Sequence, residues 1–165
     1  MQIIKYSNTR IPSSYRHEIA GFLHRHLQEF GDPQEDILLA LDYIAGDSDG
    51  KGGHLLVAGI DKVIVGAVVV NSTGMKKYIP ENILVYIATH DQYRGKGIGK
   101  RLMEETIRVC DGDIALHCEP DNPARKLYEK LGFTSKYLEM RLVKEKNVSN
   151  NIKQKEIKGE FQLSQ

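Results

Sequence analysis

The 165 residues are enough for one domain with a buried core, and 41% hydrophobic with 27% charged residues is ordinary for a globular protein. A net charge of +1 gives no electrostatic reason to expect a nucleic acid or an acidic membrane surface as partner. Cys110 and Cys118 lack the number and spacing of a disulfide framework or a metal site, so we expect free thiols in a reducing compartment. With no signal-like apolar segment and no run of about 20 apolar residues, we expect a soluble, cytoplasmic protein.

The first part of the chain predicts a strand and two helices. Residues 2–6 have a short strand pattern. A helix with one apolar face is predicted to begin after Ser13 or Ser14, either of which can act as N-cap. The second helix is predicted to begin at Asp32 as N-cap, with Pro33 at the first helical position.

After the second predicted helix, the spacing of apolar residues changes from the period of a helix to that of strands. Residues 54–60 and 63–70 are apolar, β-branched runs joined by a tight connection, which predicts a hairpin. Gly66 inside the second run indicates a bulge or a close approach of backbone. Residues 83–89 are a third apolar run and predict a core strand.

Helices and strands alternate in the second part of the chain. A helix over 99–110 and a strand over 114–118 are predicted. Asn122 as N-cap and Pro123 at the first helical position predict a further helix. Residues 133–143 are expected to supply one or two final strands.

Composition divides the chain near residue 144. Residues 1–143 are expected to form the domain, and residues 144–165 a polar tail. The tail is a candidate for docking on its own domain or on a partner subunit, through Ile152, Ile157, Phe161 and Leu163.

A glycine-rich segment follows the strand over 83–89 and precedes a helix. Its sequence is Tyr93-Arg-Gly-Lys-Gly-Ile-Gly99-Lys100. A strand, a glycine turn and a helix start together aim backbone N–H groups and the positive end of a helix at an anion. Arg94, Lys96 and Lys100 add positive charge around it. The segment therefore predicts a phosphate or pyrophosphate site, although a glycine turn with solvated basic side chains is the alternative.

Two familiar nucleotide motifs do not fit this segment. A Walker-type loop ends Gly-Lys-Ser/Thr, whereas Gly99-Lys100 is followed by Arg101, which has no hydroxyl for magnesium. A dinucleotide fingerprint needs a third glycine where Lys100 stands. A phosphate-bearing ligand of another kind remains.

A second motif indicates what kind of phosphate-bearing ligand this is, because the two motifs together resemble those of a known family. It is Asn122-x-x-Ala-x-x-x-Tyr128-x-x-x-Gly132-Phe133, downstream of the strand over 114–118. Together with the glycine segment and the element order before it, this motif resembles the GNAT superfamily of acetyl-CoA-dependent N-acetyltransferases over residues 1–143. The resemblance implies an α/β fold with a mixed central sheet of six to seven strands, splayed central strands and about four helices.

The resemblance also implies how acetyl-CoA, as co-substrate, is held. The glycine segment would wrap the pyrophosphate, and the pantetheine arm would lie between the splayed strands, paired with backbone groups like an added strand. The residues implied are Ile87, Ala88, Thr89, Arg94, Gly95, Lys96, Gly97, Ile98, Gly99, Lys100, Asn122 and Arg125.

Catalysis by such a protein needs a base and an acid but no metal and no acyl-enzyme intermediate. A primary amine must lose a proton before it attacks the thioester. Tyr128 matches the position whose hydroxyl faces the thioester sulfur, which suggests a general acid. Glu81 or His117 is the candidate base, His90 and Glu119 lie nearby in sequence, and an ordered water is the alternative.

The acceptor is left open by the sequence. A small-molecule amine, a peptide N-terminus and a lysine side chain all fit. Four acidic residues lie in and beside the connection between the first two helices, namely Glu29, Asp32, Glu35 and Asp36. They would suit a cationic amine, although helix capping and solvation also explain their presence. His17, His24 and His26 lack a clear partner set for a metal.

Three functions therefore compete on the sequence alone. The first is an N-acetyltransferase, acting as a monomer or homodimer. The second is an acyl-CoA-binding sensor or interaction module without catalysis. The third is a generic nucleotide binder.

Overall fold

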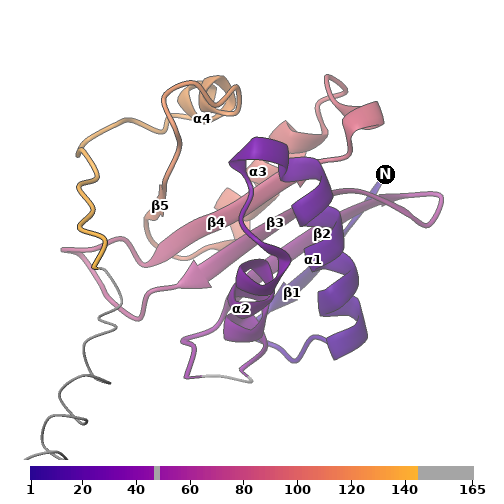
Figure 1. Ribbon diagram of the computed structural model, residues 1–165, viewed down its shortest axis with the longest axis horizontal. Helices are drawn as coiled ribbons and strands as arrows, with labels where there is room; N and C mark the ends of the chain where they lie inside the picture. Colours follow the sequence, from indigo (N-terminus) through magenta and orange to yellow (C-terminus); the bar gives the residue numbers. More distant parts are fainter. Residues whose placement is uncertain (47–48, 145–165) are drawn as a thin grey trace, which may run out of the picture. The chain divides into compact units, whose positions relative to one another are not determined.

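The computed structural model describes residues 1–46 and 49–144, within which five strands form one mixed sheet in the order β1-β2-β3-β4-β5 (Figure 1). Neighbours pair antiparallel except β4 and β5, which are parallel. The strands are β1 Gln2–Ser7, β2 Gly53–Ile60, β3 Val63–Ser72, β4 Asn82–Thr89 and β5 Ile114–Leu116.

Helices cover both faces of the sheet. Side chains of α1 and α2 pack on one face in a core with Leu55, Val69 and Tyr86. Side chains of α3 and α4 pack on the other face with Leu56 and Val68. The helical segments are α1 Ser13–Leu27, η1 Gln28–Phe30, α2 Gln34–Ala45, η2 Asp91–Tyr93, α3 Ile98–Val109 and α4 Arg125–Lys130. No helix in the described part of the chain is long and apolar enough to cross a membrane.

The prediction of six to seven strands is wrong: the described residues form five. The first compact unit is Met1–Thr134, and residues 135–144, the described part of the second, contain no helix or strand. Apolar side chains such as Leu138, Met140 and Leu142 are exposed there. The prediction of one or two final strands over residues 133–143 is therefore wrong, because an apolar segment forms a strand only where a neighbour satisfies its backbone groups. The docking residues proposed for the tail lie outside the described residues.

Several predicted helix starts are shifted. Ser13 is already helical, and Pro12 and Pro33 occupy the N-cap positions of α1 and α2 without a side-chain cap. Asp32 is therefore not the N-cap of α2. The helix α4 begins at Arg125, yet Asn122 still closes the turn before it, since its Oδ1 accepts the backbone N–H of Ala124 at 2.9 Å.

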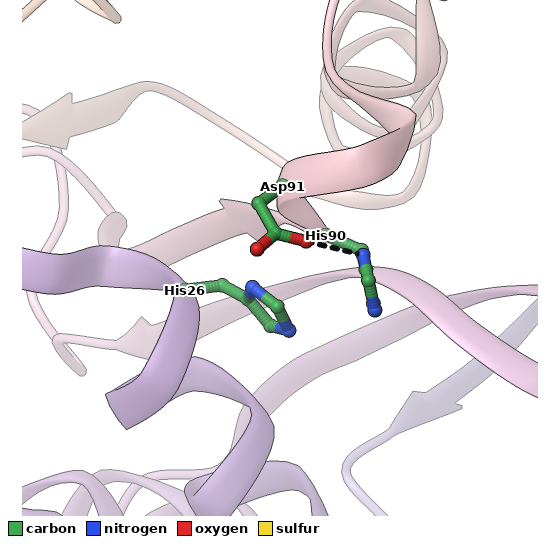
Figure 2. A group of neighbouring side chains, drawn as sticks. All are labelled: His26, His90 and Asp91. Atoms are coloured by element: carbon green, nitrogen blue, oxygen red, sulfur yellow. Dashed lines mark ion pairs between the residues drawn. The ribbon is translucent and has the colours of Figure 1, made fainter.

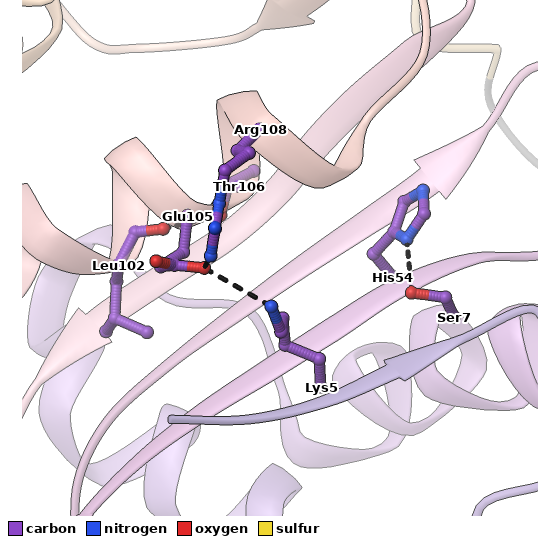
Figure 3. Close-up of polar contacts among 7 residues, drawn as sticks. All are labelled: Lys5, Ser7, His54, Leu102, Glu105, Thr106 and Arg108. Carbon is purple, nitrogen blue, oxygen red and sulfur yellow. Dashed lines mark hydrogen bonds and ion pairs between the residues drawn. The ribbon is translucent and has the colours of Figure 1, made fainter. Parts of the chain in front are cut away.

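The glycine at position 66 marks a close approach of backbone, as predicted. A Cβ there would lie 2.7 Å from Leu102 Cδ1 and 3.1 Å from Ile98 Cγ2, so only glycine lets the first turns of α3 reach β3. Within α3 the buried Thr106 hydroxyl donates to the Leu102 carbonyl at 2.8 Å. Figure 3 shows that turn and the ion pair between Lys5 of β1 and Glu105. The helix that follows the glycine segment is thus fixed against the sheet.

A hydrogen bond also links the first two strands. Figure 3 shows the ring of His54 beside the hydroxyl of Ser7, with Nδ1 and Oγ 2.8 Å apart. These residues are opposite each other in the β1–β2 register. The pair therefore ties the edge strand to the sheet.

Candidate active site

An opening between β4 and β5 is the central feature of the site. The two strands pair only from Asn82–Ile114 to Leu84–Leu116, whereas β4 continues to Thr89. The register with β3 passes from Val69–Tyr86 to Val70–Leu84, so Val85 is the extra residue of a β-bulge. The bulge comes one residue after the last pair with β5. Beyond it, this edge of β4 has no partner strand among the described residues, and we call it the free edge of β4.

The glycine segment lies at the end of that free edge. Gly95 and Gly97 have φ values of +75° and +78°, a region that side chains other than glycine disfavour. An added Cβ at either glycine would meet nothing within 4 Å. Backbone geometry, rather than crowding, therefore requires both glycines, and open space lies beside them.

The glycine segment carries backbone donors that lack acceptors among the described residues. The N–H groups of Gly95, Lys96 and Gly97 have no acceptor within the described residues. The first N–H groups of α3, which begins at Ile98, lack intrahelical acceptors as in any helix. A row of such donors beside a helix N-terminus is suited to a phosphate or pyrophosphate.

The basic side chains of the segment have other partners here. The Arg94 guanidinium donates to the carbonyl of His26 at 2.8 Å and to Gln28 Oε1 at 3.5 Å, so it points toward the end of α1. The Lys96 ammonium lies 4.6 Å from the centre of the Tyr93 ring. Lys100 pairs with Glu104 at 3.6 Å. These three basic side chains are therefore engaged with neighbouring groups, whereas the backbone N–H groups of Gly95 to Gly97 have no acceptor among the described residues.

The end of β4, the start of α3 and α4 converge at Gly99. A Cβ on Gly99 would lie 3.5 Å from both Thr89 Oγ1 and Leu127 Cδ2. Asn122 lies in the turn before α4, and the Arg125 guanidinium pairs with Glu129 at 2.8 Å. Both sequence motifs thus meet beside the free edge of β4, although they are separated along the chain by β5.

Tyr128 is the buried aromatic residue of α4. Its side chain is 7% exposed and its ring lies 5.9 Å from that of Phe133. Burial raises the pKa of the phenol, and the neighbouring Cys118 adds to the effect. The hydroxyl makes no hydrogen bond within the described residues. Tyr128 is therefore protonated at neutral pH with its proton uncommitted. Burial also raises the pKa of the Cys118 thiol, which disfavours a nucleophilic thiolate there.

The two candidate bases lie in different surroundings. The Glu81 carboxylate accepts the backbone N–H groups of Asp113 at 2.9 Å and Lys77 at 3.2 Å. These hydrogen bonds hold its pKa below the usual range. Glu81 also precedes the paired end of β4, and six residues of strand, about 20 Å, separate it from Ile87. The structure does not bring Glu81 to the opening.

His117 follows the last paired residue of β5 and is exposed. Leu116 and Cys118 pack in the core on the side of α3 and α4. Alternation along the chain therefore directs His117 to the opposite face, the side of α1 and α2. Of the two predicted bases, His117 is the one at the opening.

Two contacts around the α1–α2 connection were not visible in the sequence. The Tyr86 hydroxyl donates to Asp32 Oδ2 at 2.7 Å, across 54 residues of sequence. Desolvation and this hydrogen bond raise the pKa of Tyr86. His26 and His90 stack with ring centres 4.4 Å apart. No spacing along the chain signals either contact, because each joins α1 or its following loop to β4.

A family model described as the acetyltransferase (GNAT) domain matches residues 51–135, just over half of the 165 residues. The chain belongs to the GNAT acetyltransferase family.

Solved structures share this fold at low sequence identity. A transcriptional regulator from Bacillus halodurans C-125 is 21% identical, covers 87% of this chain and 100% of its own, and has a TM-score of 0.60. A ribosomal-protein-alanine N-acetyltransferase from Brucella melitensis biovar Abortus 2308 is 20% identical (88% and 99% covered, TM-score 0.59). The aminoglycoside N-acetyltransferase AAC(6')-Iy in complex with CoA is 18% identical (88% and 95% covered, TM-score 0.59). No curated protein matches the chain.

Proposed function

We propose that this protein transfers the acetyl group of acetyl-CoA to a primary amine by direct attack. The observation that carries the proposal is the free edge of β4 from Val85 to Thr89, which runs from the bulge to the unpaired N–H groups of the glycine segment. An extended pantetheine arm can pair with such an edge as an added strand. Its pyrophosphate would then lie on the N–H groups at the start of α3.

The proposed CoA contacts are mainly to backbone. They comprise Ile87, Ala88 and Thr89 along the strand, Gly95 to Lys100 around the pyrophosphate, and Asn122 beside the arm. Arg94 and Arg125 would have to leave their present partners, the His26 carbonyl and Glu129, to reach the cofactor. We therefore assign them a smaller share of CoA affinity than the backbone donors.

The proposed reaction begins when the amine loses its proton to His117 or to an ordered water. The nitrogen then attacks the thioester carbonyl, and the negative charge that develops on oxygen is stabilised by backbone N–H groups of β4 near the bulge. When the C–S bond breaks, the CoA sulfur takes a proton from Tyr128. Because burial raises its pKa, Tyr128 keeps that proton until the thiolate leaves.

The proposed acceptor is a small-molecule or peptide amine that carries positive charge. Glu29, Asp32, Glu35 and Asp36 are all exposed in and after the connection between α1 and α2, on the side of the sheet to which His117 points. These carboxylates would attract a cationic amine and raise its local concentration. AAC(6')-Iy, whose fold this chain shares, is an aminoglycoside N-acetyltransferase, which is consistent with such an acceptor.

The test is an acceptor panel in which free-thiol release from acetyl-CoA is measured beside direct CoA binding. We expect CoA to bind and thiol release to depend on an amine, with loss of release in Tyr128→Phe. ATP or NAD binding in place of CoA would overturn the proposal.

A non-catalytic acyl-CoA sensor is the second candidate. It is favoured by the shared fold of the Bacillus halodurans transcriptional regulator. Tight CoA binding without thiol release for every amine in the panel would select it over the enzyme.

A further inference from the structure

Three potential metal ligands meet where α1 ends and β4 passes into η2. His26 lies in the last turn of α1, and His90 and Asp91 follow β4 (Figure 2). One ligand atom from each of the three lies within 4.8 Å of the others. A tetrahedral zinc ion with ligands at about 2.0–2.1 Å places them about 3.3 Å apart, so modest side-chain rotations would close the set.

His26 is the most buried of the three residues. Its residue is 6% exposed, and its ring makes tilted contacts with the rings of Phe22 and His90 at centroid distances of 4.6 and 4.4 Å. Neither ring nitrogen has a hydrogen-bond partner within the described residues, and neither is among the fully enclosed polar atoms that lack one. A ring nitrogen of His26 is therefore both unoccupied and open to an incoming ion.

His90 lies beside Asp91. Its Nδ1 is 2.8 Å from Asp91 Oδ1 and accepts the backbone N–H of Gln92 at 3.3 Å, while its other nitrogen has no hydrogen bond in the described part of the chain. The Gln92 N–H also donates to Asp91 Oδ1 at 2.7 Å, so one backbone donor holds the two side chains next to each other. Asp91 retains a second oxygen, and its side chain is 58% exposed, so it can rotate.

The charges around the three side chains are of both signs. Asp91 is the one anion of the group, and Arg25 and Arg94 are the nearby cations that act on His26. The Arg94 guanidinium is turned to backbone and amide acceptors, including the His26 carbonyl at 2.8 Å. Two neutral imidazoles and one carboxylate are a donor set suited to zinc and related first-row divalent ions.

We propose that His26, His90 and Asp91 form a binding site for a divalent zinc-like cation. Bound there, the cation would join the end of α1 to the segment between β4 and the glycine loop. It would stabilise the folded protein by linking these two segments, and the acetyl transfer proposed above does not require it. The site does not depend on the proposed function.

The test is metal binding by the full chain, stripped of metal and without acetyl-CoA. Co²⁺ serves as a spectroscopic probe of tetrahedral geometry, and Zn²⁺ binding is measured by calorimetry and by thermal unfolding. We expect one ion per chain and a rise in Tm. Asp91→Asn and His90→Asn should each weaken binding by at least about tenfold. Asp91 is exposed, so its variant is expected to fold even if a His26 variant does not.

Two controls complete the experiment. His17→Ala removes an exposed histidine of the same helix, whose Nδ1 contacts the Ser13 carbonyl, and should leave binding unchanged. Cys118→Ser tests binding through a thiol. Absence of binding to the unmodified chain, unchanged binding in Asp91→Asn and His90→Asn, or loss of binding only in Cys118→Ser would overturn the proposal.

Discussion

Replacing Gly97 by alanine tests whether the left-handed backbone of the glycine loop matters for the cofactor. Gly97 has a φ of +78° and no atom within 4 Å of an added Cβ, so the substitution perturbs backbone conformation and nothing else. A non-glycine residue in this region costs about 1–2 kcal/mol. If the variant loop relaxes away from the bound geometry, the same free energy appears as a roughly 5- to 30-fold weaker CoA affinity.

Gly46→Ala is the matched control. Gly46 ends α2 with a φ of +75° and an equally empty surrounding. Calorimetry should show weaker CoA binding in Gly97→Ala and unchanged CoA binding in Gly46→Ala, whose urea unfolding reports the cost of the same backbone conformation away from the cofactor. Equal CoA affinity in the two variants would refute the assignment of this loop to the cofactor.

Three further predictions concern packing, acid stability and the acceptor. Gly66→Ala would place a Cβ 2.7 Å from Leu102 Cδ1 and should lower the free energy of unfolding by about 1–3 kcal/mol in urea titrations; an unchanged midpoint would contradict the packing of α3 on β3. Because the folded-state pKa of Glu81 is depressed, its contribution to stability is present above the unfolded pKa and is lost as pH falls through the folded value. Glu81→Gln should therefore flatten the acid side of the stability profile and leave turnover at pH 8 unchanged, whereas a large loss of turnover would restore Glu81 as base. Asp32→Asn, which can still accept the Tyr86 hydroxyl, should raise KM for a cationic amine several-fold and leave CoA affinity unchanged; an unaltered KM would remove Asp32 from acceptor binding.

The sequence predicted best what local backbone chemistry dictates. The glycine loop was visible because Gly95 and Gly97 occupy conformations that other residues disfavour. Gly66 was recognisable as a point of close approach, whereas Asn122, predicted as the N-cap, instead closes the turn before α4, whose N-cap is Ala124. In each case the local backbone favours one residue type, and this preference can be recognised without knowing which residue lies opposite in the fold.

Features that depend on long-range partners could not be predicted. The Tyr86–Asp32 hydrogen bond and the stacking of His26 on His90 join segments far apart in the chain. Asp32 looked like a helix cap because capping is a local signal, whereas its actual partner is on β4. The contact of Arg94 with the His26 carbonyl is likewise long-range, and the role of Arg94 at the phosphate stays a prediction.

The most direct test of the account compares unmodified protein with Tyr128→Phe in single-turnover acetyl transfer to an amine found in the acceptor panel. The substitution removes one hydroxyl that has no hydrogen-bond partner in the described residues, so folding and CoA affinity should be preserved. We expect N-acetyl amine and free CoA to appear in equal amounts, at a rate that Tyr128→Phe lowers by roughly ten- to a thousand-fold. An unchanged rate in Tyr128→Phe would contradict its role as the acid, and acetylated protein as an intermediate would contradict direct attack.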